Sequence, residues 1–174
     1  QPEYNFEGTP LMVDGVVYTT AGTRRAVVAV DAGTGEYLWM HRLDEGERAD
    51  EAPRRLSGRG LAYRDTGGSG QIIYVTPGYR MIALDAVTGQ RIPSFGTDGI
   101  VDLKQHNDQF IDPLTGEIGW NSAPVVAREV YVRLRVGQRT QRRRGPGLCR
   151  FVRSRRSVDH LRVDVCGQRY QLRD

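Results

Sequence analysis

Cysteine, lysine and long apolar runs are scarce in this chain of 174 residues. Both cysteines, Cys149 and Cys166, lie in the last quarter, so the first 132 residues carry no sign of the redox compartment and no cysteine metal centre. Lys104 is the only lysine. No run is long enough to cross a bilayer, and no apolar leader follows Gln1, which predicts an internal or processed start.

Several common catalytic patterns are also missing. The chain has no glycine-rich phosphate loop, no serine nucleophile elbow and no paired helix carboxylates. Its three histidines, His41, His106 and His160, are scattered and lack the spacing of metal ligands. These common patterns therefore offer no candidate for a catalytic or metal-binding residue in the chain.

The formal net charge of +4 conceals two opposed parts. The residues up to Val132 carry a net charge of −6, whereas those from Arg133 onward carry +10. This contrast predicts one unit over residues 1–132 and an arginine-rich tail over 133–174. Such a tail is typical of a nucleic-acid-binding arm. The single lysine, the few aromatics and the abrupt end of the β pattern argue against that interpretation, so no specific nucleic acid is expected.

Translation out of frame explains the tail better. Residues 152–158 can be encoded so that reading one nucleotide later gives Phe-Asp-Pro-Ala-Gly-Arg-Trp, which is similar to the motif described next. This hypothesis predicts a disordered tail, and the coding DNA tests it.

One motif recurs in the first 132 residues. Asp31-x-x-Thr34-Gly35-x-x-x-Trp39 is repeated 54 residues later as Asp85-x-x-Thr88-Gly89, and each copy follows strand-like runs. A partial third copy ends at Trp120 but has no apolar strand before it, so it is either a blade end or a loop mimic. A unit that recurs at this spacing indicates a repeat architecture.

Runs rich in β-branched residues, separated by turn residues, predict the strands of each unit. In the first unit they cover 9–18, around an Asp-Gly turn, then 26–30 and 36–39. In the second they cover 61–63, 72–76 and 81–84, with 42–55 as the connecting loop. A further strand-turn-strand start is predicted over 122–130. Four short strands joined by tight turns form one antiparallel propeller blade.

Trp39 is then expected to fill the gap between neighbouring blades, although a buried tryptophan of a β-sandwich has the same pattern. Pro93 stands at the corresponding place of the second unit, so that blade must close differently.

The repeated motif resembles the tryptophan-docking repeat of quinoprotein dehydrogenases, which use pyrroloquinoline quinone (PQQ). Residues 6–18 and the segment Arg59-Gly60-x-Ala62-Tyr63 resemble two further pieces of that family, so the likeness covers about 5–132. It implies an all-β fold, a partial β-propeller of about two blades plus the start of a third from an eight-bladed parent.

The resemblance also implies a cofactor site and an activity. It places Glu7, Arg59 and Ser122 (or Asn121) at cofactor contacts, and an arginine fork can grip a carboxylate of the quinone. The alternative for Glu7 and Arg59 is an ordinary solvated surface charge. The alternative for Asn121 or Ser122 is the polar start of a strand. The parent would oxidise an alcohol, sugar or polyol hydroxyl, with an aspartate as base, hydride transfer to the quinone and a bound Ca²⁺.

Several further expectations follow from the resemblance. A quinone or cytochrome would accept the electrons, in the periplasm or on the outer face of the cytoplasmic membrane. Residues 53–56 stand where many alcohol-oxidising members have adjacent cysteines, which favours the sugar- or polyol-oxidising type. The metal ligands and the base lie further along the family's chain, so this chain alone is expected to be inactive. A non-enzymatic propeller scaffold is the alternative function.

Overall fold

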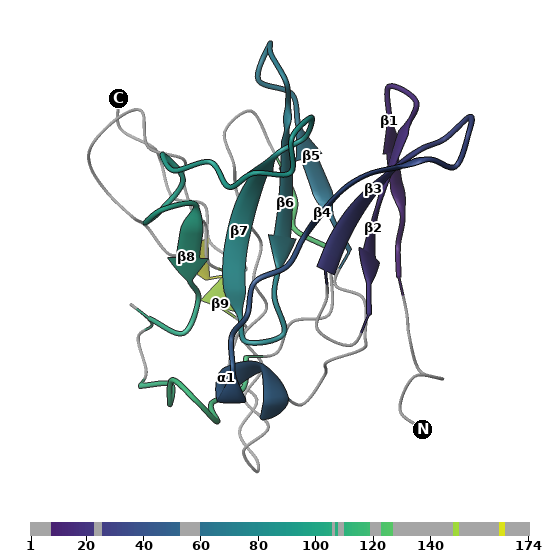
Figure 1. Ribbon diagram of the computed structural model, residues 1–174. Helices are drawn as coiled ribbons and strands as arrows, with labels where there is room; N and C mark the ends of the chain where they lie inside the picture. The colour runs from purple at the N-terminus through teal and green to yellow at the C-terminus, as the bar shows by residue number, and fades with distance from the viewer. Residues whose placement is uncertain are drawn as a thin grey trace, which may run out of the picture.

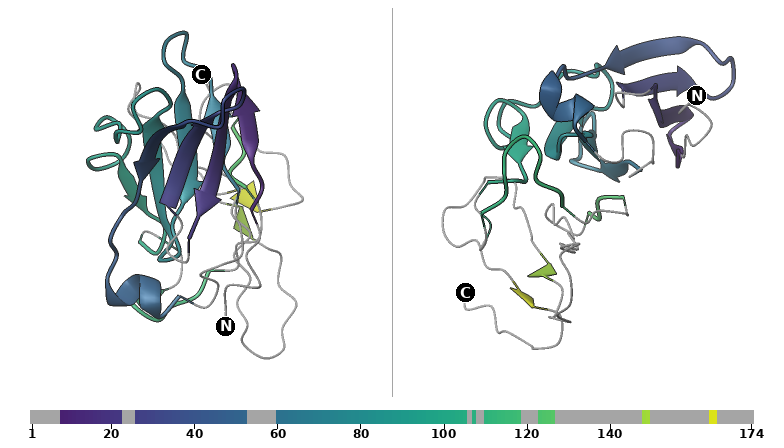
Figure 2. Two further views of the ribbon diagram at one scale, coloured as in Figure 1. Left: turned by 45° about the vertical axis from the view of Figure 1, so that its right-hand side comes forward. Right: turned by 90° about the horizontal axis from the view of Figure 1, so that it is seen from below.

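The computed structural model describes residues 8–22, 26–52, 60–105, 107, 110–118 and 123–126, with the backbone of 148–149 and 164–165. Two four-stranded antiparallel sheets dominate this part (Figure 1), and a shared apolar core packs them against each other. Neither sheet closes into a barrel (Figure 2). Among the described residues, no helix has the length and apolar character needed to cross a membrane.

The first sheet has the order β1-β2-β3-β4. Its strands are β1 (Leu11–Val13), β2 (Val16–Ala21), β3 (Ala26–Asp31) and β4 (Tyr37–His41). Asp14 and Gly15 have φ values of 49° and 79°, as a tight hairpin turn between right-twisted strands requires. The four strands predicted for the first unit are therefore confirmed.

The second sheet has the order β5-β6-β7-β8. Its strands are β5 (Ala62–Arg64), β6 (Gln71–Val75), β7 (Arg80–Asp85) and β8 (Ile100–Asp102). As Pro93 led us to expect, this blade closes differently: only an isolated bridge joins Leu84 to Arg91, and the outer strand β8 begins after further turns. Phe95, within those turns, is 2% exposed.

Three short described elements lie outside the two four-stranded sheets. The predicted loop over 42–55 contains the helix α1 (Glu47–Asp50), which the polar composition of this segment did not indicate. In the tail, β9 (Leu148–Cys149) pairs with β10 (Asp164–Val165) in the antiparallel sense. The rest of the predicted tail lies outside the described residues.

Two apolar cores flank the second sheet. The core between the sheets joins Val27, Ala29 and Trp39 to Ile72, Tyr74, Ile82 and Leu84. The core on the far side joins Ile73, Val75, Met81 and Ala83 to Phe95, Leu103 and Ile118. The second sheet is therefore buried on both faces, whereas Met12 and Met40 of the first sheet are 65% and 55% exposed. Apolar surface of this kind is what an open propeller fragment exposes when neighbouring blades are missing.

The two sheets form a wedge. Among the described strands, β1 and β5 are the only pair from different sheets whose Cα atoms approach within 8 Å. The sheets thus converge at their first strands and diverge towards their last. This arrangement confirms an all-β partial propeller of two blades, in which first strands lie near the axis and last strands at the rim. Of the third-blade start predicted over 122–130, the structure describes only 123–126, and these residues form no strand.

Candidate functional site

The three copies of the repeated motif fold into nearly the same turn. Asp31 Oδ1 accepts hydrogen bonds from the amides of Gly33 and Thr34 at 2.9 and 2.8 Å and from Thr34 Oγ1 at 3.0 Å. The Gly35 amide donates to the Asp31 carbonyl, and Gly35 has a φ of 75°. Asp85 forms the same set of bonds with Val87, Thr88 and Gly89.

The third copy keeps the turn but lacks the sheet. Asp112 Oδ1 accepts from the Leu114 and Thr115 amides at 2.9 and 2.7 Å and from Thr115 Oγ1 at 3.0 Å. No described residue between Leu103 and Asp112 belongs to a strand. This part agrees with a loop mimic, while Trp120 lies outside the described residues.

Hydrogen bonds keep the turn carboxylates ionised. The Thr34 amide, its hydroxyl and the Gly33 amide lower the pKa of Asp31, and the corresponding donors lower that of Asp112. Burial acts in the opposite direction at Asp85, but hydrogen bonds from Ser69, Thr88 and Val87 leave its pKa below the usual value. A carboxylate held this way is a poor proton acceptor, so these aspartates shape turns.

Trp39 links the two sheets where they diverge. It lies on β4, and its Nε1 donates to the Ala86 carbonyl of the second sheet's turn at 3.0 Å. A Cβ atom on Gly89 would lie 2.5 Å from the indole, so the ring packs directly on a backbone without a side chain. The expected role of Trp39 between blades is confirmed.

The predicted cofactor residues Glu7, Arg59 and Ser122 (with Asn121) lie outside the described residues. Their described neighbours nevertheless meet at one point. A Cβ atom on Gly60 would lie 2.8 Å from Ala123 Cβ and 3.8 Å from Thr9 Cβ. Thr9 follows Glu7 by two residues, whereas Gly60 and Ala123 directly follow Arg59 and Ser122. Three segments far apart in sequence therefore come together beside the first strands of the two sheets.

A partly buried ion pair joins α1 to the end of β8, beside the turn between β6 and β7. Arg48 donates from both terminal nitrogens to Asp102 at 2.8 and 2.6 Å, and its Nε donates to the Gly78 carbonyl at 2.7 Å. Glu45 accepts from Thr76 Oγ1 and from the Gly78 amide. Burial raises the pKa of Asp102, but the Arg48 and Lys104 hydrogen bonds outweigh it and leave the pKa lowered.

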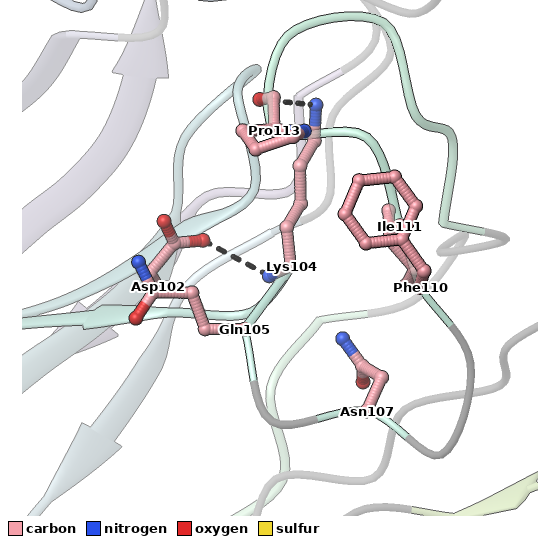
Figure 3. Close-up of a pocket in the computed structure, with 7 residues that line it drawn as sticks. All are labelled: Asp102, Lys104, Gln105, Asn107, Phe110, Ile111 and Pro113. Atoms are coloured by element: carbon pink, nitrogen blue, oxygen red, sulfur yellow. Dashed lines mark hydrogen bonds between the residues drawn. The ribbon is translucent and has the colours of Figure 1, made fainter.

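A pocket of about 320 Å³ lies beside this ion pair (Figure 3). Its lining consists of Asp102, Lys104, Gln105, Asn107, Phe110, Ile111 and Pro113. Lys104 Nζ donates to the Pro113 and Leu114 carbonyls at 3.0 and 2.9 Å, and burial lowers its pKa. Both charged groups of the pocket are thus engaged in holding loops, which argues against an acid–base role for either.

Sequence reasoning did not identify Arg48, Asp102 or Lys104 as structurally important. The one sequence feature that sets Lys104 apart is that the chain contains no other lysine. Within the described ranges, no three His, Cys, Asp or Glu side chains gather as a metal site would require.

Comparison with known proteins gives a consistent result. The sequence pattern of the family described as glucose/ethanol/alcohol dehydrogenase, beta-propeller domain (PQQ) matches residues 1–151. The dehydrogenase subunit of the alcohol dehydrogenase (quinone) of Gluconacetobacter polyoxogenes is 41% identical over 93 residues, which cover 52% of this chain. The quinoprotein glucose dehydrogenase of Gluconobacter oxydans is 24% identical over 140 residues, which cover 72% of this chain.

A solved structure supports the same relationship. The quinohemoprotein alcohol dehydrogenase ADHIIG of Pseudomonas putida HK5 superposes with a TM-score of 0.59 and 28% identity over 84% of this chain. The matched regions are small parts of these proteins: 12% of the Gluconacetobacter subunit, 17% of the glucose dehydrogenase and 18% of the Pseudomonas chain.

Proposed function

This chain belongs to the PQQ-dependent glucose/ethanol/alcohol dehydrogenase family, and from this premise we propose that it is part of an enzyme that oxidises a hydroxyl group. The substrate of the whole enzyme is an alcohol, sugar or polyol. Its electrons pass to a quinone or cytochrome, in the periplasm or at the outer face of the cytoplasmic membrane. The match over residues 1–151 is the observation that carries this proposal.

The segments that meet at Gly60 supply the chain's share of the cofactor site. The Arg59 guanidinium forms bidentate hydrogen bonds with a carboxylate of the quinone, and Glu7 orients that arginine. The Ser122 hydroxyl donates a hydrogen bond to the cofactor. The quinone itself supplies the hydride acceptor when bound. The convergence of Thr9, Gly60 and Ala123 supports this arrangement, since it brings together the three segments that carry these residues.

The chain by itself is inactive, because the metal ligands and the catalytic base belong to other parts of the enzyme. The test adds PQQ and Ca²⁺ to the purified chain and measures dye-linked oxidation of glucose, quinate and ethanol. No oxidation above background is expected. Turnover by the chain alone would contradict the proposed division of the active site.

A binding experiment tests the role of Arg59 separately. We expect weak quenching of tryptophan fluorescence by PQQ, abolished in Arg59→Ala and reduced in Arg59→Lys, which keeps the charge but loses the fork. Arg64→Ala is the matched control, because Arg64 ends β5 and lies away from Gly60. Equal losses in Arg59→Ala and Arg64→Ala would indicate nonspecific attraction of the anionic quinone.

The arginine-rich tail over 133–174 remains a separate prediction. We propose that it is translated out of frame, even though the family match continues to residue 151. Sequencing the coding DNA decides this point, since the alternative frame must encode the motif-like string over 152–158.

A further inference from the structure

Ten of the described glycines have a positive φ, and five of them have open surroundings. Gly15, Gly22, Gly35 and Gly67 have φ values between 67° and 79°, and a Cβ atom on any of them would meet nothing within 4 Å. At these positions only the backbone conformation calls for glycine.

Gly60 belongs to the other five, at which an added Cβ atom would lie within 2.8 Å of a neighbouring atom. Its φ is 66°, and the Cβ atom that it lacks would lie 2.8 Å from Ala123 Cβ, closer than side-chain carbons pack. The next nearest atoms, Ala123 Cα and Thr9 Cβ, would be at 3.5 and 3.8 Å, which are ordinary contact distances. The Cβ of Ala123 is therefore the one atom that leaves no room for a side chain at position 60.

The residues after Gly60 prevent it from moving away. Leu61 is buried in the core between the two sheets, and Ala62 is buried in the core on the far side of the second sheet. Because alternate side chains enter opposite cores, a shift of the backbone at Gly60 would disturb both. A larger residue at position 60 must therefore displace Ala123.

We infer that the contact between Gly60 and Ala123 is a positioning junction that sets the spacing of the cofactor-binding segments. This inference rests on the proposed function. Consecutive Cα atoms are about 3.8 Å apart, so a displacement at Gly60 or Ala123 is passed directly to Arg59 and Ser122. Thr9, in contact with the same point, connects Glu7 to the junction. Gly60 and Ala123 act through these neighbours and are positioning residues.

A distance measurement tests the junction without any cofactor. Spin labels are attached to cysteines in a Glu7→Cys/Ser122→Cys variant whose native cysteines are changed by Cys149→Ser and Cys166→Ser. Pulsed electron paramagnetic resonance then gives the distribution of distances between the labels. We expect a single narrow distribution with Gly60 present and a broadened or displaced one in Gly60→Ala.

Two further variants separate this contact from general strain. Gly35→Ala introduces the same unfavourable φ at an open position, so the distribution should stay narrow. The double variant Gly60→Ala/Ala123→Gly removes the 2.8 Å contact and should restore the narrow distance distribution. The inference is overturned if Gly60→Ala leaves the distances unchanged, if Gly35→Ala alters them equally, or if Ala123→Gly fails to restore them.

A PQQ titration of the unlabelled variants distinguishes this inference from the proposed function. Gly60→Ala should weaken binding by about tenfold or more relative to Gly35→Ala, with recovery in the double variant. Equal affinity in all variants overturns the junction. If no variant binds the quinone while the label distances respond as expected, the cofactor assignment fails and the spacing role of the junction holds.

Discussion

Replacing Trp39 by alanine should uncouple the two sheets. The indole is 8% exposed, packs on the bare backbone of Gly89 and lies 5.8 Å from the ring of Tyr18. Deleting a buried tryptophan typically costs about 3–5 kcal/mol. We expect a loss of this size in the free energy of unfolding, because Trp39 fills the part of the wedge where the backbones of the two sheets are far apart.

A phenylalanine at position 39 separates packing from hydrogen bonding. It keeps most of the buried area and loses the bond from Nε1 to the Ala86 carbonyl. That carbonyl still accepts from Tyr18 Oη at 3.2 Å, so it is not left without a donor. The expected loss for Trp39→Phe is therefore only about 1 kcal/mol.

Urea unfolding followed by far-UV circular dichroism measures these losses. Tyr37→Ala is the control, since Tyr37 lies on the same strand but is 59% exposed, and a surface change should cost about 0.5 kcal/mol or less. A loss below about 1 kcal/mol for Trp39→Ala, or one no larger than that of Tyr37→Ala, would refute this view of how the sheets are joined.

Three further predictions concern charged and titratable groups. Arg48→Met leaves the largely buried Asp102 carboxylate without its partner and should lower the free energy of unfolding by about 3–5 kcal/mol. Arg91→Ala is the control, because Arg91 forms an exposed pair with Asp98, and it should cost less than about 1 kcal/mol. Similar losses for the two variants in urea unfolding would contradict this prediction. The folded-state pKa of Asp102 is lowered, so the contribution of this carboxylate to stability is complete above the ordinary aspartate pKa of about 4 and is lost as the pH falls further. Asp102→Asn should reduce the loss of unfolding free energy at acid pH. An unchanged pH dependence would exclude Asp102 as its source. Burial, and then the charge of Arg91, lower the pKa of His41. The stability that the folded chain gains from neutral His41 is therefore complete above about pH 6.5 and is lost on acidification. An NMR titration midpoint of His41 at or above about 6.5 would contradict this prediction.

Local patterns were predictable because their interactions span few residues. The turns at Asp31 and Asp85 are held by bonds from amides two and three positions ahead, so the motif alone specifies them. The strands of the first unit are apolar or β-branched runs bounded by turn residues, and they were predicted with nearly their observed bounds. The helix α1 was missed, since four residues in a polar segment leave no periodic signal.

Contacts between distant segments could not be predicted from a single sequence. Arg48 and Asp102 are 54 residues apart, and nothing in either local pattern indicates a pair. Phe95 follows Pro93 in a stretch that looks like a loop, yet it is buried in the core on the far side of the second sheet. For the candidate site, the resemblance pointed to Glu7, Arg59 and Ser122, but it did not reveal the contact between Gly60 and Ala123.

The amino-acid sequence by itself determined the repeat, its turns and its family, because these depend on short-range hydrogen bonds and on the order of motifs. Only the tertiary structure decided that Trp39 packs on Gly89 and that Thr9, Gly60 and Ala123 meet. Both outcomes depend on how two sheets pack, and packing sums many weak contacts between residues far apart in the chain. No local segment carries that information.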